Sequence, residues 1–131
     1  MSDVRRPGGH TAEVDYSEAG DLAAVRAFVR TRAEAHGLAP DRADLLVLAV
    51  SELATNTLQH GTGGGRVTVW ARDGQLVCEV LDQGPARDFG RAMPPADAVR
   101  GRGLAIVERV CDDVSSTTGA HGTVVRLGLT L

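Results

Sequence analysis

Residues 44–60, DLLVLAVSELATNTLQH, decide the fold of this chain. Apolar residues recur in this stretch with the spacing of an α-helix, about 100° per residue. One stripe of the expected helix holds Leu45, Leu48, Ala49 and Leu53. Glu52 and Asn56 fall inside that stripe, and because they are four residues apart their side chains project from one face about one turn apart.

A carboxylate on the buried face of a helix costs several kcal/mol unless it is paired, protonated or directed into a polar cleft. The helix alone leaves two interpretations open. In the first, Glu52 is a buried residue that a backbone group or an arginine satisfies. In the second, Glu52 and Asn56 line a cleft, where the carboxylate handles a proton or a water and the amide binds a hydrated cation.

Composition narrows the class of protein. A length of 131 residues fits one domain, and a hydrophobic fraction of 43% is ordinary for a globular protein. The net charge of −3 and an aromatic content of 3% disfavour direct binding of nucleic acid. We find no signal peptide and no membrane span, so we expect a cytoplasmic protein with two reduced, buried thiols, Cys78 and Cys111. All 14 basic residues are Arg, which excludes a lysine-containing phosphate loop.

The order of the expected elements predicts an α+β fold. The expected helices cover residues 21–37, 40–60 and 103–113, and the expected strands residues 10–16, 66–72, 75–82, 113–118 and 123–131. Asp73-Gly74 is a strong hairpin signal. We therefore predict an antiparallel-rich sheet with three helices on one face, formed by a single domain over 11–131 after a flexible N-terminus of residues 1–10. The proline- and glycine-containing segment 84–100 is predicted to be a mobile lid.

Two further clusters lie at the ends of expected elements. Asp82-Gln83-Gly84-Pro85 follows an apolar strand, and it is either a turn or a site where a carboxylate accepts a hydrogen bond from an exocyclic amine. Gly101-Arg102-Gly103-Leu104 opens a helix, and its glycines either end a loop or present free N–H groups to an anion, with Arg100 and Arg102 adding charge.

These motifs resemble the GHKL superfamily of ATP-binding domains, which gyrase, histidine kinases, mismatch-repair proteins and a heat-shock chaperone share. Within it, the chain is most similar to the bacterial anti-sigma-factor serine/threonine kinases. The motifs are SELATNTLQHG at 51–61, LDQGP at 81–85, GRGLAIVERVCDDV at 101–114 and GTVVRL at 122–127. The resemblance spans nearly the whole chain beyond residue 10, and it implies a Bergerat-type fold, a two-layer α/β sandwich with a mixed, mostly antiparallel sheet.

The resemblance implies a role for each matching residue. Asn56 would ligate Mg²⁺ through its side-chain oxygen, and Glu52 would be the catalytic carboxylate near the γ-phosphate of ATP. Asp82 would accept a hydrogen bond from the adenine amino group, Gly84 would let the base approach closely, and Thr123 would complete the adenine network.

The phosphates would be bound at the second glycine cluster. Gly101 and Gly103 would present backbone N–H groups, and Leu104 would continue the helix entry. The phosphate-facing arginine is Arg100 or Arg102, and we favour Arg100. Pro85-Ala86 departs from the second glycine of many relatives, so lid closure in those relatives does not transfer to this chain.

The resemblance implies a protein serine/threonine kinase. It would phosphorylate a small anti-sigma-factor antagonist protein with Mg-ATP, bind a sigma factor and form a homodimer as its relatives do. The alternative is a catalytically weak, nucleotide-gated protein-binding module. The presence of Glu52 favours the enzyme, because binding alone needs only Asn56, Asp82 and the glycines. A histidine-kinase fragment and a hydrolase built on Ser51 fit the sequence less well.

Overall fold

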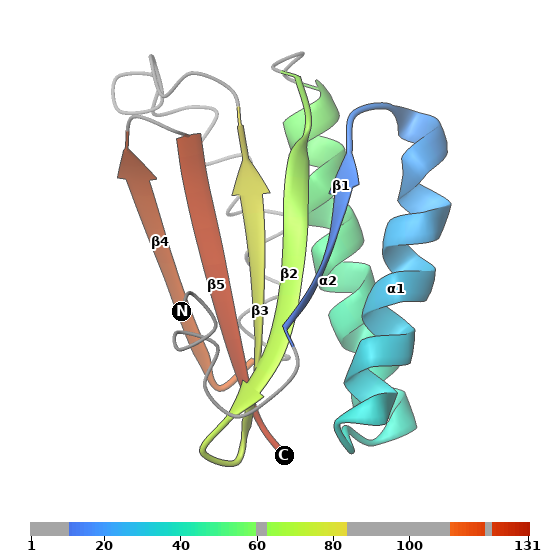
Figure 1. Cartoon of the computed structure of the whole chain (residues 1–131), viewed down its shortest axis with the longest axis vertical. Coiled ribbons are helices and arrows are strands. Elements are labelled where there is room, and N and C mark those ends of the chain that lie inside the picture. The colour runs from blue at the N-terminus through green and yellow to red at the C-terminus, as the bar shows by residue number, and fades with distance from the viewer. Residues whose placement is uncertain (1–10, 60–62, 84–110, 120–121) are drawn as a thin grey trace.

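The computed structural model describes residues 11–59, 63–83, 111–119 and 122–131 (Figure 1). The N-terminal half begins with a strand and continues with a short 3₁₀ turn and two long helices: β1 (Ala12–Tyr16), η2 (Ala19–Asp21), α1 (Leu22–Ala35) and α2 (Pro40–Gln59). The remaining elements are strands: β2 (Gly65–Arg72), β3 (Gln75–Asp82), β4 (Asp113–Gly119) and β5 (Gly122–Thr130).

The five strands form one sheet in the order β1-β2-β3-β5-β4, and the four pairings between them are all antiparallel. The predicted hairpin joins β2 to β3, with Asp73 at φ 53° and Gly74 at φ 79°. Two consecutive positive φ angles are what a tight two-residue turn requires, and they explain the Asp-Gly pair. The predicted edge strand, β1, pairs only with β2 among the described strands.

Both described α-helices lie on one face of the sheet, so the described part of the chain has two layers (Figure 1). Strand residues that face the helices are buried with them in a single core, which includes Val67, Val69, Leu76, Cys78, Leu127 and Leu129. This arrangement confirms the predicted α+β fold class. The predicted lid, the predicted flexible N-terminus and the predicted third helix up to residue 110 lie outside the described residues. The end of that helix prediction is wrong, because residues 111 and 112 are not helical and Asp113 begins β4.

The helix boundaries follow local signals. Gly37, at φ 100°, ends α1 as predicted, and Pro40 is the first residue of α2. On α1, Val25 and Val29 are fully buried, while Leu22 and Phe28 pack partly against the core. No helix in the described part of the chain is long and apolar enough to cross a membrane.

The buried face of α2 differs from the prediction. Leu45 and Leu48 are 46% and 45% exposed. The face that packs on the sheet and on α1 consists of Ala43, Leu46, Val47, Ala49, Val50, Leu53, Ala54 and Thr57. This helix carries two adjacent apolar stripes, and periodicity alone does not say which of them meets the sheet. Glu52 and Asn56 are half-buried at the margin of the packed face, not in its middle.

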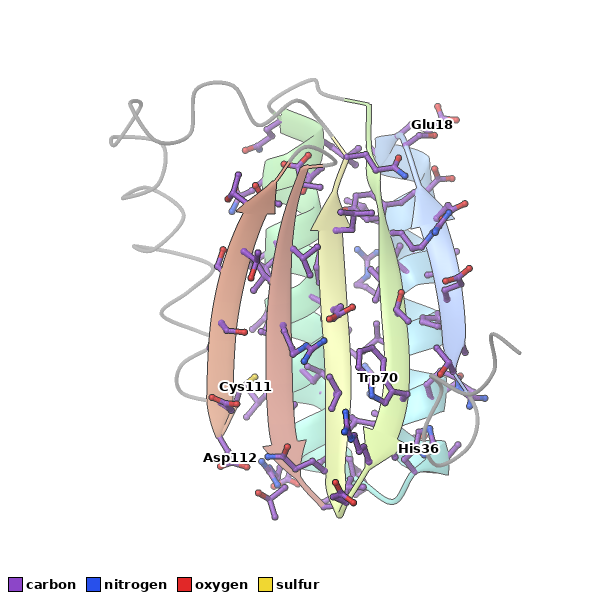
Figure 2. The ribbon with its side chains drawn as sticks, turned by 60° about the vertical axis from the view of Figure 1, so that its left-hand side comes forward. Glu18, His36, Trp70, Cys111 and Asp112 are labelled. Carbon is purple, nitrogen blue, oxygen red and sulfur yellow. The ribbon has the colours of Figure 1, made fainter. Side chains whose placement is uncertain are left out.

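The sheet face that the helices leave uncovered carries polar and aromatic side chains, with Trp70 among them (Figure 2). The Arg126 guanidinium lies 5.6 Å from the centre of the Trp70 ring and forms an ion pair of 2.6 Å with Glu79. Both cysteines are free thiols, as predicted. Cys78 is buried and Cys111 half-buried, and burial raises the pKa of Cys78 strongly and that of Cys111 to about 12.

Candidate functional site

Four of the predicted site residues lie in the described part of the chain: Glu52, Asn56, Asp82 and Thr123. The others lie outside it: Gly84, Arg100, Gly101, Arg102, Gly103 and Leu104. The structure therefore describes the side of the site that we expect to face the base and the metal. The phosphate-facing part remains a prediction.

The described site residues gather at one end of the molecule, where α2 and β3 end and β5 begins (Figure 1). Asp82 is the last residue of β3 and lies opposite Thr123 of β5 in the antiparallel register. Successive strand residues alternate between the two faces, so Asp82 shares the helix-covered face with the buried Leu76, Cys78 and Val80. By the same alternation Thr123 shares that face with the buried Leu127.

Asn56 carries a buried polar group that has no hydrogen-bond partner among the described residues, its side-chain Nδ2. Buried polar groups are normally paired, so an unpaired one is a reason to look for a ligand. The nitrogen and oxygen of an amide exchange places by a 180° flip of the side chain, so Asn56 can present either atom at the unpaired position. An oxygen there suits Mg²⁺, which prefers oxygen ligands.

The described part of the chain holds no group of three or more His, Cys, Asp and Glu side chains that could bind a metal ion. Mg²⁺ needs no such cage, because it commonly keeps several waters and is bound through one or two protein oxygens together with substrate phosphates. Asn56 as a single amide ligand fits that mode of binding.

Glu52 lies one turn before Asn56 and is half-buried. Its side chain makes no hydrogen bond or ion pair with any other described residue. It belongs to the same helix stripe as the exposed Leu45 and Leu48, beside the packed face. This position disfavours the interpretation of Glu52 as a buried carboxylate that an internal partner satisfies, and it favours a carboxylate at the margin of a cleft.

Two glycines lie against the backbone at the end of β3, where Asp82 is placed. A Cβ atom built on Gly65 would overlap the carbonyl oxygen of Leu81, and one built on Gly122, at φ 125°, would overlap the carbonyl oxygen of Asp82. The Gln83 N–H donates to the Gly64 carbonyl at 2.9 Å. Neighbouring backbone therefore packs against both sides of the strand end that carries Asp82.

Thr123 has a hydroxyl neighbour on the adjacent strand. Its Oγ1 lies 3.2 Å from Oγ1 of Thr118, and either atom can donate. Thr123 and Thr118 are directly opposite in the β4–β5 register. A hydroxyl pair of this kind provides both a donor and an acceptor next to Asp82.

The structure adds two residues that the sequence analysis did not single out, Tyr16 and Thr57. Tyr16 is 2% exposed and Thr57 is 5% exposed. The Tyr16 hydroxyl donates to the Leu81 carbonyl at 3.3 Å and is also hydrogen-bonded to the Thr57 side chain. Burial raises the pKa of Tyr16 to about 12, the hydrogen bond with Thr57 opposes this rise, and the nearby Asp82 carboxylate adds to it.

A local signal existed for the glycines but not for this tyrosine. The sequence predicts a strand that starts at residue 66, whereas Gly65 is the first residue of β2 and lies opposite Asp82. The contact between Tyr16 and Leu81 spans 65 residues of sequence, and no local pattern predicts it.

Comparison with known proteins shows the family of the chain. Residues 16–129 match the family described as "Histidine kinase-like ATPase domain". No curated protein sequence matches the chain.

Solved structures share the fold. One is the structure of the RsbU and RsbW domains of Rv1364c from Mycobacterium tuberculosis, with a TM-score of 0.71 and 22% identity over 94% of this chain and 33% of that chain. The chain thus spans a third of the length of that protein. Another is the SiaB-SiaC complex from Pseudomonas aeruginosa, with a TM-score of 0.69 and 15% identity over 98% of this chain and 93% of that chain. At these identities the likeness shows the fold alone.

Proposed function

Because the chain belongs to the family of histidine kinase-like ATPase domains, we propose that it is a protein serine/threonine kinase that binds Mg-ATP where α2 and β3 end. One observation carries the proposal. Asn56 has a buried amide atom without a partner among the described residues, at the same end of the molecule as the helix-facing Asp82. An amide that suits a metal and a carboxylate that suits an amine are the two chemical needs of an Mg-adenine nucleotide.

Asp82 would recognise the base. A carboxylate only accepts hydrogen bonds when ionised, and adenine offers an amino group where guanine has a carbonyl oxygen. Thr123 would complete this network, and its Oγ1 is already 3.2 Å from Oγ1 of Thr118. Gly84 would let the ring approach the backbone, as the resemblance to the family implies. We therefore expect binding of ATP and ADP in preference to GTP.

Asn56 would hold Mg²⁺, which would supply positive charge to the phosphates during transfer. Gly101 and Gly103 would donate backbone N–H groups to the phosphates at the helix entry that continues with Leu104. Arg100, with Arg102 as the other candidate, would add a guanidinium.

Glu52 would position or deprotonate the attacking hydroxyl of the protein substrate. Its place one turn before Asn56 supports this role, because both side chains then project from one side of α2. In phosphoryl transfer the protein contributes mainly positioning and electrostatic stabilisation, so one well-placed carboxylate is sufficient as a base.

The substrate would be a small anti-sigma-factor antagonist protein, and the kinase would also bind a sigma factor as a homodimer in the cytoplasm. The family resemblance supports these partners, and one similar structure is itself a complex of two proteins. The competing function is a nucleotide-gated binding module without transfer activity.

Transfer of a labelled phosphoryl group distinguishes the two functions. The protein is incubated with γ-labelled Mg-ATP and candidate antagonist proteins, and the label is located by mass spectrometry. We expect label on a serine or threonine. Glu52→Ala should slow transfer by about 10²–10⁴-fold with ATP affinity nearly unchanged. Glu34→Ala, which removes an exposed carboxylate on α1, is the matched control and should leave the rate unchanged.

ATP binding without transfer to any antagonist would favour the gated module. Calorimetry tests the base contact separately: Asp82→Asn should weaken ATP binding by about 1–3 kcal/mol, the usual cost of a lost buried hydrogen-bond partner. Equal affinity of the wild-type protein for ATP and GTP would remove Asp82 from base recognition.

A further inference from the structure

A pair of buried hydroxyl groups joins three elements beneath the proposed site. Tyr16, the last residue of β1, donates from its hydroxyl to the Leu81 carbonyl of β3 at 3.3 Å and is hydrogen-bonded to the Thr57 side chain of α2. The Thr57 hydroxyl in turn lies 3.1 Å from the Leu53 carbonyl. The two hydroxyls hold two protons between them: Tyr16 donates to the Leu81 carbonyl, and the Thr57 proton serves the Leu53 carbonyl or the Tyr16 oxygen, which can accept it.

The two anchoring points are next to the two proposed ligand-binding residues. Thr57 directly follows Asn56 on α2, and Leu81 directly precedes Asp82 on β3. Gly65 makes room for the link, because a Cβ atom there would lie 2.7 Å from the Tyr16 hydroxyl oxygen. The link thus lies between the segment that would hold the metal and the segment that would read the base.

Helix and strand ends are the places where regular structure loosens first. The apolar core lies under the middle of β3, at Leu76, Cys78 and Val80, and does not reach Asp82 at the strand end. A hydrogen bond from a rigid, fully buried ring can hold this end where apolar packing no longer does. Such a bond is also directional, which apolar contact is not.

We propose that Tyr16 is a positioning residue whose hydroxyl, with that of Thr57, fixes the end of β3 relative to the last turns of α2, and so sets the geometry in which Asp82 meets the base while Asn56 meets the metal. The proposal rests on the proposed function, because it assigns Tyr16 to the same nucleotide site. The competing explanation is that Tyr16 only fills the core with its ring.

Tyr16→Phe separates the two explanations, because it keeps the ring and removes only the oxygen. Calorimetry with Mg-ATP is compared with calorimetry using the Mg²⁺ complex of purine riboside triphosphate, which lacks the amino group that Asp82 would read. We expect Tyr16→Phe to weaken ATP binding by about three- to tenfold, the effect of one net hydrogen bond, and to leave the purine analogue nearly unchanged.

Thr57→Val tests the other half of the pair and should give the same pattern. The double variant should be little worse than either single variant, because residues that act through one shared bond are not additive. Thr68→Val is the matched control: it removes a hydroxyl from β2, on the sheet face away from the helices, and should alter neither affinity.

An equal loss for both nucleotides would mean that the Tyr16 hydroxyl only supports the fold, and no loss for either would mean that only the ring matters. Either result overturns the proposal. If the wild-type protein binds neither nucleotide, the proposed function fails. Hydrogen exchange on the free protein then tests whether the Tyr16 hydroxyl holds the end of β3 against the last turns of α2. Faster exchange in Tyr16→Phe at the amides of both 80–83 and 56–59 would support it, and unchanged exchange would overturn it.

Discussion

The two ends of the sheet satisfy their polar groups in different ways. At the end where β5 finishes, charged and backbone groups satisfy one another: Arg42 of α2 donates to the Thr130 carbonyl at 2.8 Å, and the Thr130 N–H donates to Asp112 at 2.7 Å. Arg42 also lies 3.5 Å from the Asp112 carboxylate. Figure 2 places Asp112 at this end, far from Glu18, which follows β1 at the other end.

At the other end, where α2 and β3 finish, the polar groups face the helix layer. The amide nitrogen of Asn56 is buried without a described partner, and glycines replace side chains against the backbone around Asp82. One end is therefore closed by its own residues, and the other has a buried amide group that no described residue satisfies. The same helix, α2, runs between them, so one element serves stability at its start and the proposed site at its end.

The largest expected difference between the ends is in nucleotide binding. Asn56→Ala should weaken Mg-dependent ATP binding by more than about 100-fold, since groups that only orient a metal ligand already contribute about 10–100-fold. Arg42→Ala, at the start of the same helix, should leave ATP affinity unchanged. Calorimetry with and without Mg²⁺ measures both, and circular dichroism checks that each variant is folded. Comparable losses of ATP affinity in the two variants would contradict the assignment of the nucleotide site to the end of α2 alone.

The next effect concerns the stability of the fold. Gly122 and Gly74 both have positive φ, 125° and 79°, but only Gly122 is crowded, because nothing lies within 4 Å of a Cβ at Gly74. Gly122→Ala should destabilise the protein by about 2–5 kcal/mol, from backbone strain and overlap together. Gly74→Ala should cost only about 1–2 kcal/mol, from backbone strain alone. Urea unfolding measures both. Equal losses of unfolding free energy would show that the backbone around Asp82 relaxes to accommodate the added Cβ atom.

The smallest effect is the pH dependence of the closed end. The Thr130 N–H, with Arg42 as a lesser contributor, holds the pKa of Asp112 below its usual range. A depressed pKa stabilises the folded state above the unfolded value of about 3.9, and this contribution is lost as the pH falls through the folded pKa. Asp112→Asn should therefore be less stable than wild type at pH 7, with the difference closing toward pH 3 in thermal melts. A difference that is constant with pH would show that the charge of Asp112 is not involved.

Local signals predicted the elements well, because each depends on residues close in sequence. The Asp73-Gly74 pair predicted the hairpin, and Pro40 predicted the start of α2. The predicted buried stripe of α2 was half right: Ala49 and Leu53 are buried, whereas Leu45 and Leu48, which continue an equally regular stripe, are exposed. Only the position of the sheet, a long-range property, distinguishes the two stripes.

The site was predictable only as far as its residues belong to a motif. Asn56 and Asp82 belong to sequence motifs, and the structure places both at one end of the molecule. Tyr16 and Thr57 belong to no motif, and their partnership depends on how β1 joins the sheet beside β2. Residues that support a site from another element are recognised from contacts rather than from patterns.

The position of Tyr16 also bears on the order in which the chain folds. The two hairpins, β2–β3 and β4–β5, join strands that are close in sequence, whereas the Tyr16 hydroxyl meets Leu81 across 65 residues. Closing so long a loop costs more conformational entropy than closing a local hairpin does, so such contacts tend to form late. We expect φ-values near zero for Tyr16→Phe and higher ones within the β2–β3 hairpin. A nascent chain would then acquire its scaffold before its nucleotide site, and only a nearly complete fold would be able to bind ATP.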